Sequence, residues 1–256
     1  ILIGNAPGGF ASGFLGRAIA HHFSRRGVLV YGVDRSSVEN TPIADLKAYS
    51  ALALPEPRFE SLLAKWKPQA VIHCAGSASV PQSMQNPSED YQQGPALSFF
   101  VLDAIRRILP ECAFLLLSSA AVYGNPIRLP ISEDDALMPI SAYGFHKWQS
   151  ELVCREFTKL YGLKTASARV FSAYGPGLRR QVMWDIAQKA LTQNEIILQG
   201  DGSESRDFLY SADIVRALEC ILQSAPLHGE VYNVASGEET RIDTLAAMIV
   251  ERLACA

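Results

Sequence analysis

Two side chains that can move a proton together stand close to each other in the segment SAYGFHK, residues 141–147. Tyr143 and Lys147 are four positions apart. On a helix, residues with that spacing share one face at roughly 5–6 Å. An ammonium group beside a phenol favours loss of the phenolic proton. A tyrosine in that setting can take a proton from an alcohol while hydride leaves the same carbon. The same spacing also occurs by chance on helix surfaces, so this chemistry requires partners elsewhere in the chain.

Two serines supply one such partner. Ser118 and Ser119 end the apolar run FLLLSS, residues 114–119, which predicts a buried strand. Ligands of open parallel sheets bind beyond the carboxyl ends of the strands. A serine hydroxyl at that edge can hold the oxygen from which the tyrosine takes its proton. Ser119, Tyr143 and Lys147 are therefore candidate catalytic residues.

A glycine-rich turn near the start of the chain predicts a dinucleotide site. The segment GNAPGGFASGFLG, residues 4–16, lies between a strand-like run and a helical pattern. Backbone N–H groups in such a turn can approach a pyrophosphate, and the helix N-terminus adds partial positive charge. Asp34 ends the next strand-like run and can accept both hydroxyls of an adenosine ribose, which favours NAD over NADP. Arg35 weakens this preference without reversing it.

Strand-like and helical patterns alternate along most of the chain. The predicted strands are apolar throughout, as expected where both faces of a parallel sheet are covered. This order predicts an α/β fold, a doubly wound parallel sheet of the Rossmann type. We expect residues 1–171 to form the dinucleotide-binding domain and 172–256 mainly a small C-terminal substrate-binding lobe, with segments near 207–235 returning to the larger domain. Residues 35–58 lack a regular pattern and predict a loop, whereas 165–175 predict one strand.

The composition argues against several other classes of protein. Apolar residues make up 48% and charged residues 19% of the chain, the profile of a globular protein. The formal net charge is −3 and no dense Lys/Arg run or long apolar run occurs, so we expect no nucleic-acid partner and no membrane partner. The five cysteines are scattered, which predicts neither a disulfide framework nor a metal site and fits a cytoplasmic protein. The chain begins inside a strand-like run and stops inside a helical one, which leaves open whether its ends are complete.

The chain resembles the extended short-chain dehydrogenase/reductases, in the branch of nucleotide-sugar epimerases and dehydratases. The matching motifs extend over nearly the whole chain and are specific for the family but not for its substrate. They are GFLG (13–16), Asp34, VIHCAG (71–76), SSAAVYG (118–124), Tyr143 with Lys147, RVFSAYGPG (169–177) and GDGSESRDFLYSADI (200–214).

This resemblance implies roles for particular residues. Ser119, Tyr143 and Lys147 match the family's catalytic set, in which the lysine also holds the nicotinamide ribose. Arg206 matches an arginine that grips the nucleotide diphosphate, where a fork of N–H donors suits phosphate oxygens. The alternative for Arg206 is a local ion pair with Asp207. A homodimer is expected because the family often pairs through the helix that contains the tyrosine. The NAD contacts implied by the resemblance are Gly9, Gly13, Phe14, Leu15, Gly16, Asp34, Arg35, Ala75, Gly76, Ser118, Tyr143 and Lys147. The substrate contacts implied by it are Ser79, Ser119, Ser172 and Arg206.

Four positions depart from the family pattern. The family's glycine loop usually reads Gly-x-x-Gly-x-x-Gly, but here Phe10 stands at the first glycine and Gly9 lies one residue earlier. Gly94 stands where the family often has Asn, and Ser172 replaces the Asn of the usual Arg-x-Phe-Asn stretch. The segment ALALPEPRF, residues 51–59, contains no clear Asp for the adenine. These departures affect contacts to the cofactor and the substrate and leave the implied catalytic set intact.

The reaction expected of this set is the NAD-dependent epimerisation of a nucleotide-diphosphate sugar, most simply at carbon 4. Tyr143 would remove the hydroxyl proton, and hydride would leave for NAD and return to the other face of the sugar. Two alternatives stay open: a reductase of a nucleotide-linked 4-keto sugar, and a non-catalytic nucleotide-binding protein of the same fold. A 4,6-dehydratase is disfavoured, because it needs an acidic residue just after the position of Ser119, where Ala120 and Ala121 stand.

Overall fold

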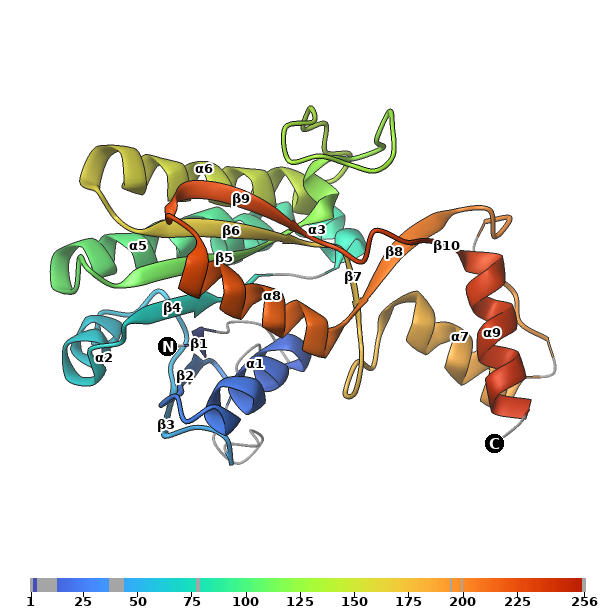
Figure 1. Cartoon of the computed structure of the whole chain (residues 1–256), viewed down its shortest axis with the longest axis horizontal. Coiled ribbons are helices and arrows are strands. Elements are labelled where there is room, and N and C mark those ends of the chain that lie inside the picture. The colour runs from blue at the N-terminus through green and yellow to red at the C-terminus, as the bar shows by residue number, and fades with distance from the viewer. Residues whose placement is uncertain are drawn as a thin grey trace.

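A seven-stranded parallel sheet forms the centre of the molecule (Figure 1). The computed structural model describes Leu2–Ile3 and residues 13–36, 44–76, 79–193, 195–198 and 200–254. The strand order is β3-β2-β1-β4-β5-β6-β9, and every neighbouring pair is parallel, which confirms the expected doubly wound sheet. The strand order reverses between β1 and β4, the point where ligands bind in open α/β sheets. The strands are β1 (Leu2–Ile3), β2 (Tyr31–Asp34), β3 (Ala48–Ala51), β4 (Ala70–His73), β5 (Ala113–Ser119), β6 (Thr165–Val170) and β9 (His228–Val234).

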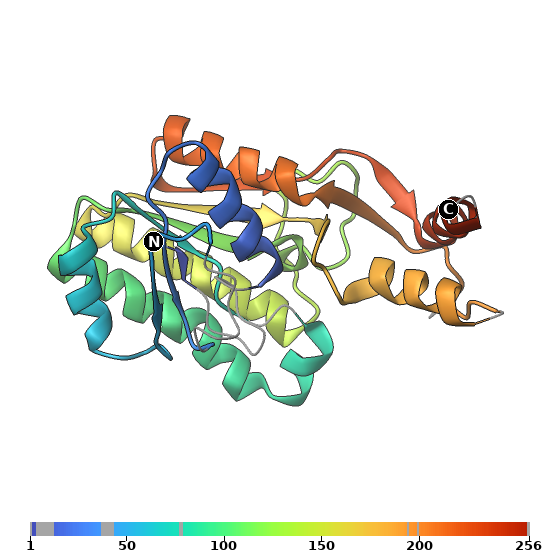
Figure 2. The same cartoon turned by 90° about the horizontal axis from the view of Figure 1, so that it is seen from below.

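Helices cover both faces of this sheet and enclose two apolar cores (Figures 1 and 2). Residues on β5 alternate between the two cores, because successive side chains of a strand point to opposite faces. Leu115 and Leu117 pack with the first pair of helices, whereas Phe114 and Leu116 pack with the second group. The first pair is α1 (Phe14–Arg25) and α8 (Ser211–Ser224), and the second group is α2 (Arg58–Trp66), α5 (Leu97–Ile108) and α6 (Ala142–Tyr161).

A smaller unit lies beyond the carboxyl ends of the central strands (Figure 1). It contains a three-stranded sheet in the order β10-β8-β7 and its own small core around Ile186, Ile242 and Leu245. Strand β9, which follows α8, belongs to the central sheet beside β6. The elements of the smaller unit are β7 (Ser172–Tyr174), α7 (Gln181–Thr192), β8 (Ser205–Tyr210), β10 (Glu239–Arg241) and α9 (Ile242–Ala254).

Two expectations about local structure were wrong. Residues 35–58 were expected to form a loop, but Ala48–Ala51 forms the edge strand β3, paired with β2. Its sequence AYSA is only partly buried, so it lacks the apolar run by which the other strands are recognised. Residues 165–175 form two strands, because the chain leaves the central sheet at Phe171 and continues as β7 beside β8.

Two sets of short helical segments pack against α6. On one side, α3 (Val80–Gln85) and α4 (Pro87–Tyr91) lead through the π-helical turn η2 (Gln92–Ala96) into α5. The π turn contains Pro95, which has no backbone N–H to donate. On the other side, the 3₁₀ turn η3 (Ala120–Val122) directly follows β5.

The close approach of α6 to η3 depends on Gly144. A Cβ at this position would lie 2.5 Å from the carbonyl oxygen of Ala121 and 2.8 Å from the Cβ of Pro139. The same turn of the helix is capped by Ser141, whose Oγ accepts a hydrogen bond from the Gly144 N–H at 3.1 Å. The missing side chain therefore lets the first turn of α6 pack directly against the end of β5.

One buried histidine lies at the end of β4. Neither ring nitrogen of His73 has a hydrogen-bond partner in the described part of the chain, and the ring packs 5.6 Å from that of Phe114. Burial, together with the positive charge of Lys147, lowers the pKa of His73 from 6.5 to about 3. The imidazole is thus held neutral in the folded protein well below the pH at which it would bind a proton in the unfolded chain.

We expect Gly144→Ala to destabilise the protein by about 1–3 kcal/mol, since the added methyl group forces α6 away from η3. Gly94→Ala is the matched control, because a Cβ there would meet only His146 and Ser150 atoms at 3.7 and 3.8 Å, which is ordinary contact. Urea unfolding of the two variants measures the difference. Equal stability of the two variants would contradict the close packing described for Gly144.

The state of His73 predicts a pH dependence of stability. Between pH 6.5 and about 3 the unfolded chain binds a proton at this position that the folded protein does not bind, so stability falls as the pH falls. From pH 7 to pH 5 this contribution amounts to about 2 kcal/mol. The free energy of unfolding of His73→Leu should therefore decrease less over this interval than that of the parent protein, as measured in urea. The same decrease in both proteins would show that His73 is not held neutral.

Candidate active site

Several residues predicted to contact the dinucleotide lie on elements around the reversal of strand order. Gly13 caps α1, and its carbonyl oxygen accepts a hydrogen bond from the Arg17 N–H at 3.0 Å. Phe14, Leu15 and the buried Gly16 form the first turn of this helix. The predicted contact Gly9 lies outside the described residues.

Asp34 ends β2 on one side of β1, so its carboxylate stands next to the reversal point. The side chain is fully buried, and its Oδ1 accepts a hydrogen bond from the Ser36 N–H at 3.4 Å. Arg35 follows at the end of the strand and is partly exposed. The structure therefore places the Asp34 carboxylate at the end of β2, where the sequence predicts the ribose contact.

Strand β4 leads on the other side of β1 into Ala75 and Gly76. Ala75 is buried, and Gly76 has a φ of +125°, a conformation that residues with a side chain rarely adopt. A Cβ on Gly76 would lie 3.5 Å from the Nζ of Lys147 and 3.6 Å from the carbonyl oxygen of Gln93. Both distances are ordinary van der Waals contacts, so it is the backbone conformation that requires glycine here, and we call the space between Gly76, Lys147 and Gln93 the cradle.

Tyr143 and Lys147 lie on successive turns of α6, as predicted. The Nζ of Lys147 donates a hydrogen bond to the carbonyl oxygen of Leu117 at 2.8 Å and lies 5.8 Å from the centroid of the Tyr143 ring. Its side chain is buried at the end of β5. The N–H of Tyr143 donates to the Oγ of Ser83 at 3.0 Å, which joins the start of α6 to α3.

Ser118 and Ser119 end β5 and make different contacts. The Oγ of Ser118 donates a hydrogen bond to Oε1 of Glu151 on α6 at 2.5 Å. The Oγ of Ser119 accepts a hydrogen bond from the Ala121 N–H at 3.2 Å, which leaves its own hydrogen available to an acceptor. The packing of Gly144 against η3 brings this serine and the first turn of α6 to the same end of β5.

The predicted substrate contacts lie on other elements. Ser79 caps α3, Ser172 begins β7, and Arg206 is exposed on the adjacent strand β8. An ion pair between Arg206 and Asp207 was the alternative reading. The Asp207 carboxylate accepts hydrogen bonds from the N–H groups of Ser236 and Gly237 and from the Ser236 hydroxyl, at 2.7–2.8 Å. Asp207 thus anchors the turn before β10.

A buried ionic network beside the site was not found from the sequence. Arg169 and Glu151 are 1% and 2% exposed, and two N–H groups of the arginine donate to the two carboxylate oxygens at 3.0 and 2.8 Å. Arg169 also donates to the Tyr123 hydroxyl at 2.7 Å, which in turn donates to Asn233 Oδ1 on β9 at 2.7 Å. Burial opposes the charge of Arg169, but the hydrogen bonds and charge of Glu151, together with the contact to Tyr123, outweigh it and raise the pKa of Arg169. A charged residue inside the otherwise uncharged strand TASARV was the available signal.

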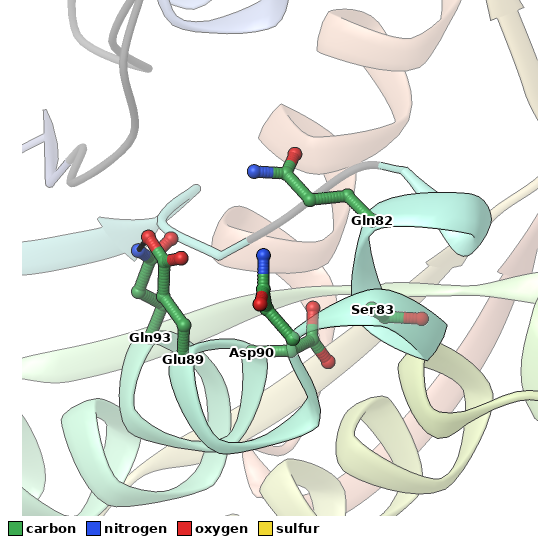
Figure 3. A pocket seen from close by; sticks show the side chains of 6 residues that line it. Gln82, Ser83, Glu89, Asp90 and Gln93 are labelled. Carbon is green, nitrogen blue, oxygen red and sulfur yellow. Dashed lines mark hydrogen bonds between the residues drawn. The ribbon is translucent and has the colours of Figure 1, made fainter.

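A second pair of interacting side chains that was not found from the sequence joins α6 to α4. Nδ1 of His146 is 2.5 Å from Oδ2 of the buried Asp90 on α4. Asp90 also lines a small hollow of about 10 Å³, room for about one water molecule, shown in Figure 3. A larger hollow of about 250 Å³ lies within residues 123–138. Neither hollow includes Ser119, Tyr143 or Lys147, so the candidate site is defined by these side chains at the reversal point. The other residues lining the smaller hollow are Gln82, Ser83, Asn86, Glu89 and Gln93.

The described residues contain neither a metal site nor a membrane-spanning helix. In the part of the chain that the structure describes, no group of three His, Cys, Asp or Glu side chains could hold a metal ion. No helix among those residues is long and apolar enough to cross a bilayer.

Comparison with known proteins agrees with this geometry. The chain is 32% identical over 225 residues to a GDP-6-deoxy-D-mannose reductase of Pseudomonas aeruginosa, covering 83% of this chain and 72% of the relative. It is 30% identical over 185 residues to a putative UDP-glucose 4-epimerase of Methanocaldococcus jannaschii, covering 71% of this chain and 60% of the relative. An uncharacterized UDP-glucose epimerase of Bacillus subtilis is matched over 49% of its length, so the chain spans about half to three fifths of these two epimerase relatives.

A solved structure and a family model give the same result. The UDP-glucose 4-epimerase of Thermotoga maritima, solved with UDP-glucose, superposes with a TM-score of 0.86 at 26% identity, over 98% of this chain and 81% of that one. The model of the NAD-dependent epimerase/dehydratase family matches residues 11–235. The chain therefore belongs to the NAD-dependent epimerase/dehydratase family, which confirms the family expected from its motifs and NAD as the cofactor of that family.

Proposed function

We propose that the protein epimerises a nucleotide-diphosphate sugar at carbon 4, with Tyr143 as the acid and base. One observation carries the proposal. Lys147 is anchored to the end of β5 beside the cradle at Gly76, with Tyr143 one turn earlier on the same helix. This arrangement supports a proton-transferring tyrosine at the reversal point of the sheet, where a dinucleotide binds.

The residues at this point fit NAD. The cradle that a Cβ on Gly76 would fill provides for close approach of a ligand to the backbone, and Asp34 provides a carboxylate for a ribose. We propose that Gly13 to Gly16, Asp34, Arg35, Ala75, Gly76 and Ser118 hold the cofactor, together with Lys147 at the nicotinamide ribose. When bound, NAD accepts hydride from the sugar carbon and returns it.

In the proposed reaction, Tyr143 takes the proton of the sugar hydroxyl as the carbon loses hydride, and gives the proton back when hydride returns. The positive charge of Lys147, 5.8 Å from the Tyr143 ring, stabilises the phenolate during the step. Ser119 donates its free hydrogen to the same sugar oxygen. Epimerisation then requires that the oxidised sugar turns and accepts hydride on its other face.

The substrate is proposed to be held mainly by the smaller unit. Arg206 is exposed on β8, where its guanidinium can bind the diphosphate through two N–H groups at once. Ser172 on β7 and Ser79 on α3 supply hydroxyl contacts in this proposal. Binding through the diphosphate leaves the sugar free to turn. We accordingly assign residues 1–171, together with the segment near 207–235, to cofactor binding and the rest of 172–256 to substrate binding.

A 4-keto sugar reductase is the second candidate. It is favoured by the 32% identity to a GDP-6-deoxy-D-mannose reductase over 225 residues. Such an enzyme would use the same serine, tyrosine and lysine, but it would consume reduced cofactor in each turnover. A dehydratase is not proposed, because Ala120 and Ala121 have no side chain that could move a proton.

The long helix α6 also supports the expected homodimer. Large apolar side chains on α5 and α6 are exposed to solvent, an arrangement that often marks an interface. These side chains are Phe99, Phe145, Leu152, Leu160 and Tyr161.

The four cysteines that the structure describes are free thiols, which agrees with a reducing compartment such as the cytoplasm proposed for this protein.

The proposed reaction predicts turnover without added cofactor. A panel of UDP-, GDP-, CDP- and dTDP-sugars is incubated with the purified protein, and the products are separated by chromatography. We expect conversion of one sugar nucleotide to its 4-epimer, slowed by about 10²–10⁴-fold in Tyr143→Phe. Tyr161→Phe, at the exposed end of the same helix, is the matched control and should keep full activity. Turnover of a 4-keto sugar only after addition of NADH or NADPH would instead establish the reductase.

Sedimentation equilibrium tests the dimer. Leu152 is 46% exposed near the middle of α6, so Leu152→Glu should shift a dimeric parent to the monomer without loss of helicity. A monomeric parent protein would contradict the proposed dimer.

A further inference from the structure

Two hydrogen bonds join α6 to β5 beside the proposed reacting groups, and we call each of them a rung. Tyr143, Lys147 and Glu151 recur every four residues and so occupy one face of α6. Lys147 bonds to the carbonyl oxygen of Leu117, and Glu151 bonds to the hydroxyl of the next residue, Ser118. Ser119 is the next residue of the strand, and Tyr143 lies one turn before Lys147 on the helix. These are the two groups proposed to meet on the sugar oxygen.

The rung at Ser118 is rigid, because its partner is itself fixed. Glu151 is held by two N–H groups of Arg169 on the neighbouring strand β6, and all three side chains are at most 4% exposed. A carboxylate bound on both oxygens has little freedom to turn. Arg169 continues the network to Tyr123 and from there to Asn233 on β9. Two strands of the central sheet, β5 and β6, therefore hold one face of α6 in register, and β9 bonds to Tyr123 at the end of the network.

The network itself does not compensate the charge of Lys147. Glu151 is the carboxylate nearest to Lys147 along this face of the helix, but it is neutralised by Arg169 in a buried ion pair. Glu151 can therefore fix the helix without cancelling the positive charge that Tyr143 requires.

We propose that Ser118, Glu151 and Arg169 are positioning residues, which set the register of α6 on β5 so that Tyr143 and Ser119 meet the same oxygen of the substrate. This inference rests on the role proposed above for Tyr143. It gives Ser118 a function through Glu151 in addition to any contact with the cofactor. Glu151 and Arg169 act without touching the substrate.

Ser118→Ala is the sharpest test, since it removes one rung and leaves the ion pair between Glu151 and Arg169 in place. Thr165→Val is the matched control. Thr165 is a fully buried hydroxyl on β6 that bonds to Thr158 and to the carbonyl oxygen of Cys154 at the far end of α6. Both variants thus remove one buried hydroxyl that joins the sheet to α6, one at the site and one away from it. Ser118→Thr restores a hydroxyl at the tested position.

With NAD added to saturation, we expect Ser118→Ala to lower kcat by about ten- to a hundredfold, because small misplacements of reacting groups are costly, while the KM for the sugar nucleotide stays near the parental value. Thr165→Val should lower the unfolding temperature similarly and leave kcat unchanged, and Ser118→Thr should recover kcat relative to Ser118→Ala. Equal kcat in Ser118→Ala and Thr165→Val would overturn the positioning role.

Amide hydrogen exchange keeps this test separate from the reaction itself. If the parent protein converts none of the sugar nucleotides, the proposed function fails, but the register of α6 can still be measured. The first two turns of α6, residues 142–149, should exchange faster in Ser118→Ala than in Thr165→Val. The same exchange in both variants would refute the inference whatever the substrate is.

Discussion

The hydrogen bond from Lys147 to the carbonyl oxygen of Leu117 is the contact on which the candidate site depends. It ties the helix that carries Tyr143 to the strand that ends in Ser119. It also places a buried ammonium group beside the cradle at Gly76, between the cofactor end and the chemistry end of the site. Glu151 repeats the attachment one turn later, and Gly144 permits it one turn earlier by removing the side chain that would separate α6 from η3. A tyrosine and a lysine with this spacing acquire a chemical role only through such attachments.

The other buried titratable groups near Lys147 are either paired or held neutral. An isolated charge inside a protein is strongly unfavourable. Arg169 and Glu151 are therefore paired through two hydrogen bonds, and Nη1 of the arginine donates to Tyr123 and to the carbonyl oxygen of Glu133. His73 instead remains neutral, since burial and Lys147 both disfavour its charged form. The only buried positive charge next to the cradle is thus Lys147 in the part of the chain described here.

Much of this could be predicted from the sequence, because the signals are local. Apolar runs ending in Asp34 and Ser119 are typical of parallel strands, and the spacing of Tyr143 and Lys147 placed them on one helical face. Strand β3 was missed because AYSA at the sheet edge is only partly buried and carries no apolar run. The break at Phe171 was missed because β6 and β7 join different sheets, a fact that depends on tertiary pairing. The link between Glu151 and Arg169 was missed because the two residues lie on different elements, 18 positions apart.

In the proposed reaction, Tyr143 exchanges a proton while hydride leaves and returns to the same sugar carbon. The most direct measurement uses a sugar nucleotide deuterated at carbon 4 and follows the label by mass spectrometry and NMR during turnover in ordinary water. We expect the epimer to keep its deuterium at carbon 4, because the hydride never exchanges with solvent. Replacement of the deuterium by solvent hydrogen would contradict it, since it would show that carbon 4 loses a proton and not a hydride.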